Sequence, residues 1–412
     1  MKSSNFLKTL GPGILFASAA IGVSHLVQST RAGASYGFLL LGAVLIANVV
    51  KFPFFEFGSR YAAATGTSLL AGYRKRGKWA VYVYLLITLG SMFVVTAAVS
   101  FVCAGILTNL LGLSLSVAQM SGALFIGVVA LLLIGRYSAL DGFLKVVSIF
   151  LLISTVAVFV VTLLNGPVAE STGLESAGFW EVSTLSFTIA LIGWMPTAVD
   201  MSVWNSLWTL ARMKQTGYKS SVREVLFEFR LGYVISALLA VCFLTLGAYL
   251  MYGTGEEFSD SAIVFADQIV ALYTRTLGVG FRWVIAISAF SVMLSTTITV
   301  FDGYARTLRE IAVQIRDRPL PKTFSPLFLI GLAAGSYMII AFYVTSLKSL
   351  VDFATTLSFV IAPVIAYLNL KAMTGAEVSG PGELNQGWRI YGWIGVILLS
   401  LFTFCYLLLL AL

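Results

Sequence analysis

The sequence has few charged residues and almost no histidine or cysteine. Of its 412 residues, 11% are charged, one is a histidine and three are cysteines. An ordinary soluble domain carries about 25% charged residues, so this chain has too few to cover a surface exposed to water. The cysteines, Cys103, Cys242 and Cys405, lie in apolar segments without paired spacing. We therefore expect neither disulfides nor a cysteine-based metal site.

Several functional motifs are also missing. The chain has no nucleophile elbow, no phosphate-binding loop and no Cys/His spacing typical of a metal site. We therefore expect that the protein is not an enzyme and that it holds no resident cofactor. The net charge of +8 is not gathered into a basic domain, which argues against nucleic-acid binding. The first apolar segment is too long for a cleavable signal peptide, and no hydrophilic mature domain follows it.

The chain is rich in hydrophobic residues, which form long uninterrupted runs. Hydrophobic residues make up 59% of the sequence, and the mean hydropathy is +0.94. Apolar runs between polar stops predict an all-α integral membrane protein with about eleven transmembrane helices, forming one domain over residues 1–412. The predicted spans are residues 9–34, 37–63, 79–111, 115–135, 140–164, 180–211, 227–252, 279–308, 325–346, 349–373 and 387–411.

The charges between the spans predict the orientation. Basic residues lie before the first span and in or beside the loops that follow the second, fourth, sixth and eighth spans. They are Lys2, Lys8, Arg74, Lys75, Arg76, Lys78, Arg136, Lys145, Arg212, Lys214, Lys219, Arg223, Arg306, Arg309, Arg316, Arg318 and Lys322. Residues 165–181 and 253–267 instead carry Glu170, Glu175, Glu181, Glu256, Glu257, Asp260 and Asp267. Because basic loops stay in the cytoplasm, we expect a cytoplasmic N-terminus and an external C-terminus. The short termini and the absence of targeting segments fit a bacterial cytoplasmic membrane, and we expect a monomer.

The sixth predicted span is interrupted. Residues 189–204 read IALIGWMPTAVDMSVW, an apolar helix pattern that breaks at 194–197 and then resumes with Asp200 inside it. Pro196 removes a backbone donor, and each unsatisfied backbone group costs several kcal/mol in the bilayer core. Such a break is expected beside a cavity, although a simple proline kink without a ligand is the alternative.

The first span carries a second interruption. A helix start at Gly11-Pro12-Gly13 is followed by Gly22-Val23-Ser24-His25 in the middle of the apolar run. Two interrupted spans five spans apart are typical of an inverted repeat. We expect residues 9–164 and 180–373 to be the two repeats, with 387–411 as an added helix.

Three side chains at the breaks could carry the chemistry. His25 could bind a metal, carry a proton or donate to an anion, or it could be a satisfied core group. Met195 offers a soft thioether that suits transition metals, although methionine in a membrane core is usually packing. Asp200 could serve a cation or a proton, or could cap the second half-helix.

Other charges have simpler explanations. Lys51, Glu56 and Arg60 in the second span are interpreted as a helix end whose charges pair or reach the interface. Asp302 and Asp352 lie near the ends of their spans and are interpreted in the same way.

Three segments give the chain a family resemblance. GPGILFASAAIGVSHLVQSTRAGASYG in the first span, Met195-Pro196 in the sixth and STTITVFDGYARTLRE in the eighth resemble the Nramp family of divalent metal transporters. The resemblance implies a LeuT-type fold of two five-helix inverted repeats, with discontinuous first and sixth helices, and a transport function.

The resemblance also implies a binding site, with substitutions. Met195 matches the family's methionine ligand, and Ile192 falls where a backbone carbonyl contributes. His25 stands at the metal-binding Asn, and Thr197 replaces the histidine after the proline. The family's charge-neutralising Asp is absent, because the Asp-Pro-Gly positions are Gly22, Val23 and Ser24. Ala354 replaces a Gln ligand, and Ala97 and Ser100 replace the third-span acids of the family's proton route, so we expect that route to be absent.

Two functional hypotheses follow. The first is a secondary transporter or symporter of divalent transition metals, with His25, Met195 and Asp200 as metal ligands and the backbone at Gly22 and Ile192 assisting. The second is a carrier of a small organic solute such as an amino acid or carboxylate, bound by the half-helix ends with Ser24, Thr197 and His25 donating. A sensor or scaffold that has lost transport is a third possibility.

Overall fold

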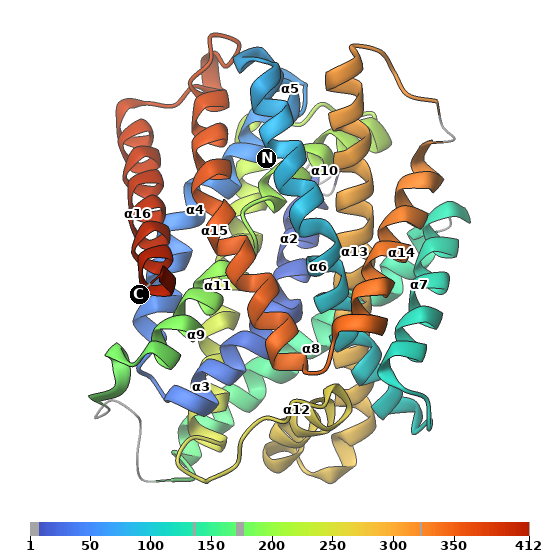
Figure 1. The fold of residues 1–412 in the computed structure, drawn as a ribbon, viewed down its shortest axis with the longest axis vertical. Coiled ribbons are helices and arrows are strands. Elements are labelled where there is room, and N and C mark those ends of the chain that lie inside the picture. The colour runs from blue at the N-terminus through green and yellow to red at the C-terminus, as the bar shows by residue number, and fades with distance from the viewer. Residues whose placement is uncertain (1–7, 135–136, 170–176, 322–323, 412) are drawn as a thin grey trace.

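The computed structural model describes residues 8–134, 137–169, 177–321 and 324–411, and within these ranges it contains helices and no β-strand. Figure 1 shows long helices running along one direction as a bundle, with short helices across its two ends. The all-α prediction is confirmed.

The helices follow the predicted spans closely. Their bounds are α2 Pro12–Ala20, η1 Ile21–Ser29, α3 Thr30–Tyr36, α4 Leu41–Thr65, α5 Leu69–Arg76, α6 Lys78–Leu111, α7 Val117–Ile134, α8 Tyr137–Asn165, α9 Val182–Gly193, α10 Met201–Thr216, α11 Val222–Leu250, α12 Ala262–Leu277, α13 Arg282–Arg316, α14 Phe324–Tyr343, α15 Leu347–Met373 and α16 Gln386–Ala411, with short 3-10 turns η2 Ala177–Trp180, η3 Val279–Phe281 and η4 Gly380–Gly382. In the described part of the chain, nine helical segments are long and apolar enough to cross a membrane. The fifth predicted span corresponds to α8, and the sixth to the pair α9 and α10.

Two short helices were not predicted. Helix α5 lies between the second and third spans, and α12 begins in the acidic segment 253–267 and ends before the eighth span. Both are too short or too polar to qualify as spans, which is why a search for apolar runs misses them. Helix α12 buries one face through Phe265, Ile269 and Tyr273.

The basic segments gather at one end of the bundle. Helix α5 and the C-terminal ends of α10 and α13 lie at the top of Figure 1, and α12 lies at the opposite end. An ion pair of 3.1 Å between Arg74 and Asp317 joins α5 to the end of α13. This grouping fits the predicted topology, while the side of the membrane on which it lies stays a prediction. Lys2, Arg136, Glu170, Glu175 and Lys322 lie outside the described residues.

The start of the first span is held by a carboxylate from α11. Glu228 Oε1 accepts hydrogen bonds from the backbone N–H groups of Gly11 and Gly13, each at 2.9 Å. These N–H groups have no partner inside their own helix, so the buried carboxylate satisfies them and complements the helix dipole. The half-helix α2 is thereby fixed against α11.

Charged groups of the second span are paired, as predicted for Glu56 and Arg60. Glu56 is fully buried, and its carboxylate contacts Arg60 at 2.5 Å and Arg230 of α11 at 2.6 Å. Lys51 differs, because it neither reaches the interface nor joins these charges. It points into the break of the sixth span.

Candidate functional site

The predicted break in the first span is confirmed at Gly22. Its backbone is non-helical (φ −59°, ψ −122°), inside a widened π-helical stretch. A Cβ atom on Gly22 would lie 2.5 Å from the Thr296 hydroxyl of α13, so only glycine allows this approach. The Ser29 and Thr30 hydroxyls donate to the carbonyls of Ser24 and His25, both at 3.3 Å, and compensate for lost helical bonds.

The break in the sixth span is also confirmed. Helix α9 ends at Gly193 and α10 begins at Met201, with a cis peptide bond between Met195 and Pro196. The backbone carbonyls that lose their helical hydrogen bonds at this break accept hydrogen bonds from a lysine side chain instead. The Lys51 ammonium of α4 donates to the carbonyl oxygens of Ile192, Gly193, Met195 and Thr197, at 2.7, 2.8, 3.1 and 3.2 Å respectively.

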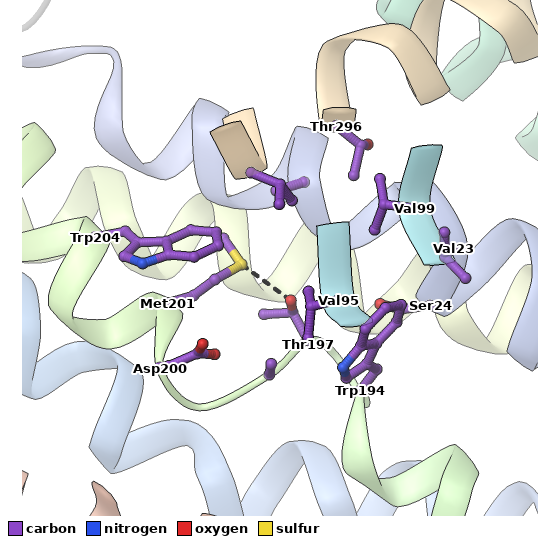
Figure 2. Close-up of a pocket in the computed structure, with 13 residues that line it drawn as sticks. Val23, Ser24, Val95, Val99, Trp194, Thr197, Asp200, Met201, Trp204 and Thr296 are labelled. Carbon is purple, nitrogen blue, oxygen red and sulfur yellow. Dashed lines mark hydrogen bonds between the residues drawn. The ribbon is translucent and has the colours of Figure 1, made fainter. Parts of the chain in front are cut away.

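A small cavity lies between the two breaks (Figure 2). Its volume of about 30 Å³ holds one or two water-sized groups in this conformation. The lining residues come from the two broken spans, α6 and α13: Ala19, Val23, Ser24, Val95, Val99, Trp194, Thr197, Ala198, Asp200, Met201, Trp204, Thr296 and Val300.

Asp200 is the one acidic side chain among the described residues of this lining. It is buried, and its Oδ2 accepts a hydrogen bond from the Tyr304 hydroxyl at 3.2 Å. Its Oδ1 has no hydrogen-bond partner. Asp200 is the N-cap residue of α10, and its side chain makes no capping hydrogen bond. A buried carboxylate oxygen without a partner is costly and favours a cation or a polar ligand in the cavity.

A thioether lies beside this carboxylate, but it belongs to Met201. The Thr197 hydroxyl donates to Met201 Sδ at 2.9 Å, and both side chains face the cavity (Figure 2). Trp204 lies next to them, and its indole N–H has no hydrogen-bond partner. The cavity therefore presents an unpartnered acceptor, the Asp200 Oδ1 atom.

The predicted site residues separate into two groups. Ser24, Thr197 and Asp200 line the cavity. Gly22 forms the adjacent break, and the carbonyl of Ile192 is engaged by Lys51.

His25 and Met195 lie elsewhere in this conformation. The His25 Nε2 atom is 2.7 Å from the carbonyl oxygen of Ser236 on α11, and its ring packs on Phe243. Met195 is fully buried in an apolar cluster with Leu40 and Val44. The predicted grouping of His25 and Met195 around one ion is therefore not present here, and their metal roles stay predictions. Among the described residues, no three His, Cys, Asp or Glu side chains cluster as metal ligands.

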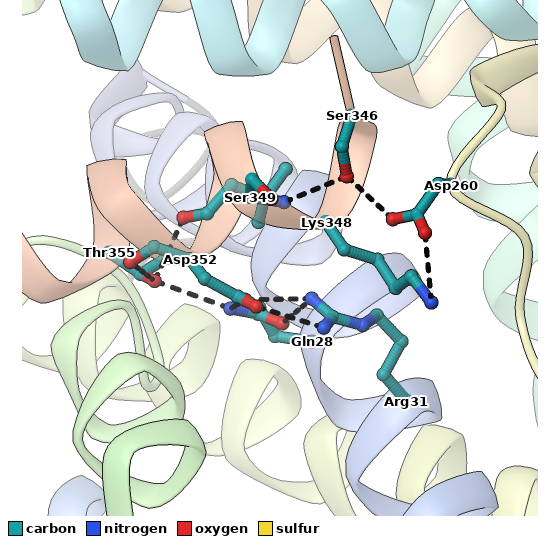
Figure 3. Close-up of polar contacts among 9 residues, drawn as sticks. Gln28, Arg31, Asp260, Ser346, Lys348, Ser349, Asp352 and Thr355 are labelled. Atoms are coloured by element: carbon teal, nitrogen blue, oxygen red, sulfur yellow. Dashed lines mark hydrogen bonds and ion pairs between the residues drawn. The ribbon is translucent and has the colours of Figure 1, made fainter. Parts of the chain in front are cut away.

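A second polar network lies toward the end of the bundle that carries α12 (Figure 3). Arg31 of α3 forms a bidentate pair with Asp352 of α15, at 2.7 and 3.0 Å. Gln28 donates to the same carboxylate at 3.0 Å and accepts from Arg31 at 2.9 Å. The resulting network ties the outer part of the first span to α15.

The acidic segment before α12 extends this network. Asp260 accepts from the Ser346 hydroxyl at 2.5 Å and pairs with Lys348 at 3.6 Å. The Ser346 hydrogen bond, with the Lys348 charge adding to it, holds the pKa of the exposed Asp260 carboxyl below its usual value.

Two broken helices beside a small buried cavity in a multi-pass membrane protein are typical of secondary transporters. The comparison with known proteins identifies the family. Residues 13–409 match the family model of the natural resistance-associated macrophage protein-like (Nramp) proteins, so the chain belongs to the Nramp family.

Individual relatives agree with this assignment. The chain is 37% identical to an uncharacterized protein of Pasteurella multocida, over 97% of this chain and 91% of that one. It is 21% identical to the divalent metal cation transporter MntH of Levilactobacillus brevis, over 97% and 88% of the two chains. The fold is similar to that of the Eremococcus coleocola manganese transporter, with a TM-score of 0.70 at 14% identity over 98% and 87% of the two chains.

Proposed function

We propose that this protein is a secondary active transporter that moves a divalent transition-metal ion across the cytoplasmic membrane by alternating access. Family membership supports metal transport in general. The observation that carries the proposal for this chain is the unpartnered, buried carboxylate oxygen of Asp200 in the cavity between the two breaks. A cation leaving water needs such a charge at membrane depth.

The donor set favours soft metals. Asp200 supplies the charge, Met201 the thioether, and Thr197 and Ser24 supply hydroxyl oxygens. Thioethers bind transition metals and are poor ligands for Mg²⁺ and Ca²⁺. The backbone carbonyl of Ile192, which the family resemblance assigns to the metal, already accepts a hydrogen bond from Lys51. The proposed site therefore lies on the α10 side of the break.

A small organic solute is the second candidate. Most of the cavity lining is apolar, with two tryptophans, and the Ser24 and Thr197 hydroxyls accompany the Asp200 acceptor. Such a lining suits a solute that carries both an apolar part and a polar group.

Uptake into proteoliposomes distinguishes the two cargoes. We expect Fe²⁺, Co²⁺ or Cd²⁺ to enter in a protein-dependent, saturable way, because the thioether and single carboxylate suit them, whereas Mg²⁺ and Ca²⁺ should not. The measurement is the quenching of a trapped metal-sensitive dye, with empty liposomes as the control. Uptake of an amino acid or carboxylate from a parallel radiolabelled panel, without any metal uptake, would favour the second candidate.

The Arg31–Asp352 pair serves as a gate in this proposal. Arg31 on α3 and Asp352 on α15 join the first span to α15 near the end of the bundle that carries α12, which we assign to the outside. Breaking the pair by Arg31→Gln or Asp352→Asn leaves the other partner's charge without its counter-ion and should favour the outward-open state.

Thiol accessibility measures this shift. In a variant whose three native cysteines are replaced, a Ser24→Cys reporter in the cavity should react with a membrane-impermeant reagent added outside intact cells. We expect at least ~10-fold faster labelling in either gate variant, corresponding to about 1.4 kcal/mol. The charge swap Arg31→Asp with Asp352→Arg should restore slow labelling. Equal labelling in all variants would contradict the gate.

A further inference from the structure

We propose that the Lys51 ammonium is a built-in monovalent cation, which organises the break of the sixth span where a free ion would otherwise be needed. The proposal concerns the scaffold of the site and stands whichever cargo the protein carries.

The geometry of Lys51 is that of a coordinated cation. Its side chain is fully buried in the middle of α4, far from either end of that helix. Four carbonyl oxygens from six consecutive residues of the break, Ile192 to Thr197, surround the nitrogen at 2.7 to 3.2 Å. An ammonium has three N–H groups, so four oxygens at this range share its charge rather than form one bond each.

The type of ligand points to a monovalent cation. Rings of backbone carbonyls replace the hydration shell of K⁺ in channel filters, and unwound carbonyls in broken transporter helices coordinate monovalent coupling ions. Here the carbonyls converge on a positive charge that is covalently tethered to a neighbouring helix.

The tether has a consequence for the transport cycle. An ion that binds and leaves can couple its own gradient to movement of the broken span, whereas Lys51 cannot leave. We therefore infer that the wild-type protein requires no free monovalent ion at this position. The α4 helix and the break of the sixth span should also move together, because Lys51 connects them.

Chemical rescue tests the proposal. The variant Lys51→Ala removes the ammonium and leaves room beside the four carbonyls. We expect purified Lys51→Ala to unfold at a lower temperature than the wild type in N-methylglucamine chloride. Ammonium or K⁺ should raise its melting temperature by several degrees in a saturable way, because an ion that binds only the folded state stabilises it.

Two further variants separate charge from space filling. Lys51→Met fills the same volume without a charge, so it should be destabilised and should not respond to ammonium or K⁺. Lys371→Ala removes a lysine of α15 that stacks on Tyr367 and Trp393, away from the break, and should respond no more than the wild type does.

A saturable rise in melting temperature with ammonium or K⁺ that is confined to Lys51→Ala supports the built-in cation. A Lys51→Met protein as stable as the wild type, or a Lys51→Ala protein that responds to ammonium and K⁺ no more than Lys51→Met, would overturn it. If Lys51→Ala is lost on purification without these ions, purification in ammonium should recover it, and Lys51→Ser provides a second small variant for the same titration. Failure to recover either variant in any salt would count against the proposal. These measurements need no cargo, so they remain informative even if the proposed metal transport is wrong.

Discussion

Replacing Asp200 with asparagine is expected to abolish cargo uptake and leave the protein folded. Asp200 is the one acidic side chain in the described cavity lining, and its Oδ1 atom has no hydrogen-bond partner. Asparagine keeps the shape and can still accept the Tyr304 hydrogen bond, but it removes the negative charge that a divalent ion requires. The change therefore tests charge more than packing.

The expected loss is large. Even indirect partners of metal ligands change affinity by about 10- to 100-fold, so removing the one carboxylate in the described cavity lining should weaken metal binding by at least ~100-fold. Calorimetric titration of the purified protein measures the binding, and dye-quench uptake in proteoliposomes measures the transport. The melting temperature should change by no more than a few degrees.

Asp302→Asn provides the matched control. This carboxylate lies on α13, where it accepts from the Trp208 indole at 3.1 Å and pairs with Arg306 at 2.6 Å, and it does not line the cavity. We expect it to keep most of the uptake. Unchanged metal binding in Asp200→Asn would rule out Asp200 as the charge-compensating ligand.

The backbone of the site was predictable from sequence, because its cause is local. Pro196 cannot continue a helix, and the Gly22–Ser24 segment weakens one, so both breaks were expected where the structure has them. The apolar run lengths likewise located the long helices. The inverted repeat stays a prediction.

The side-chain directions were less predictable. His25 and Met195 both lie at a break, but a widened helical turn and an irregular segment do not keep the rotation of a regular helix. His25 consequently faces α11, and Met195 faces the second span, while Met201 lies at the cavity. Sequence position alone cannot determine these orientations.

Lys51 could have been found from the sequence. It stands at the centre of the predicted span 37–63, whereas Arg60 stands near its end. A midspan charge is a functional candidate by default, so grouping Lys51 with Glu56 and Arg60 as a helix-end cluster was the error. Its partners were not predictable, because they are main-chain oxygens on a distant segment.

Replacing Gly58 with alanine is expected to cause the largest loss of stability of the changes considered. Gly58 of α4 lies against the start of α10, and a Cβ atom there would be 1.9 Å from the carbonyl oxygen of Ser202. That backbone cannot easily yield, because Asn369 of α15 donates to the Ser202 hydroxyl at 2.8 Å and to the Phe54 carbonyl at 3.1 Å, linking the three helices. Helices in membranes pack closely through such small residues. We expect a destabilisation of about 3 kcal/mol, at the upper end of overpacking effects.

Gly42→Ala is the control within the same helix. No atom outside the neighbouring backbone of its own helix lies within 4 Å of a Cβ at Gly42, so this change should be neutral or stabilising by up to ~1 kcal/mol, since alanine favours helix. The measurement is the melting temperature of each purified variant, with the yield of folded protein beside it.

Because Ser202 lies two residues after Asp200, Gly58→Ala should also displace the carboxylate and reduce cargo affinity, whereas Gly42→Ala should not. Equal melting temperatures for the two variants would mean that α4 and α10 do not approach this closely in the membrane, and the Lys51 connection between them would then lose its geometric basis.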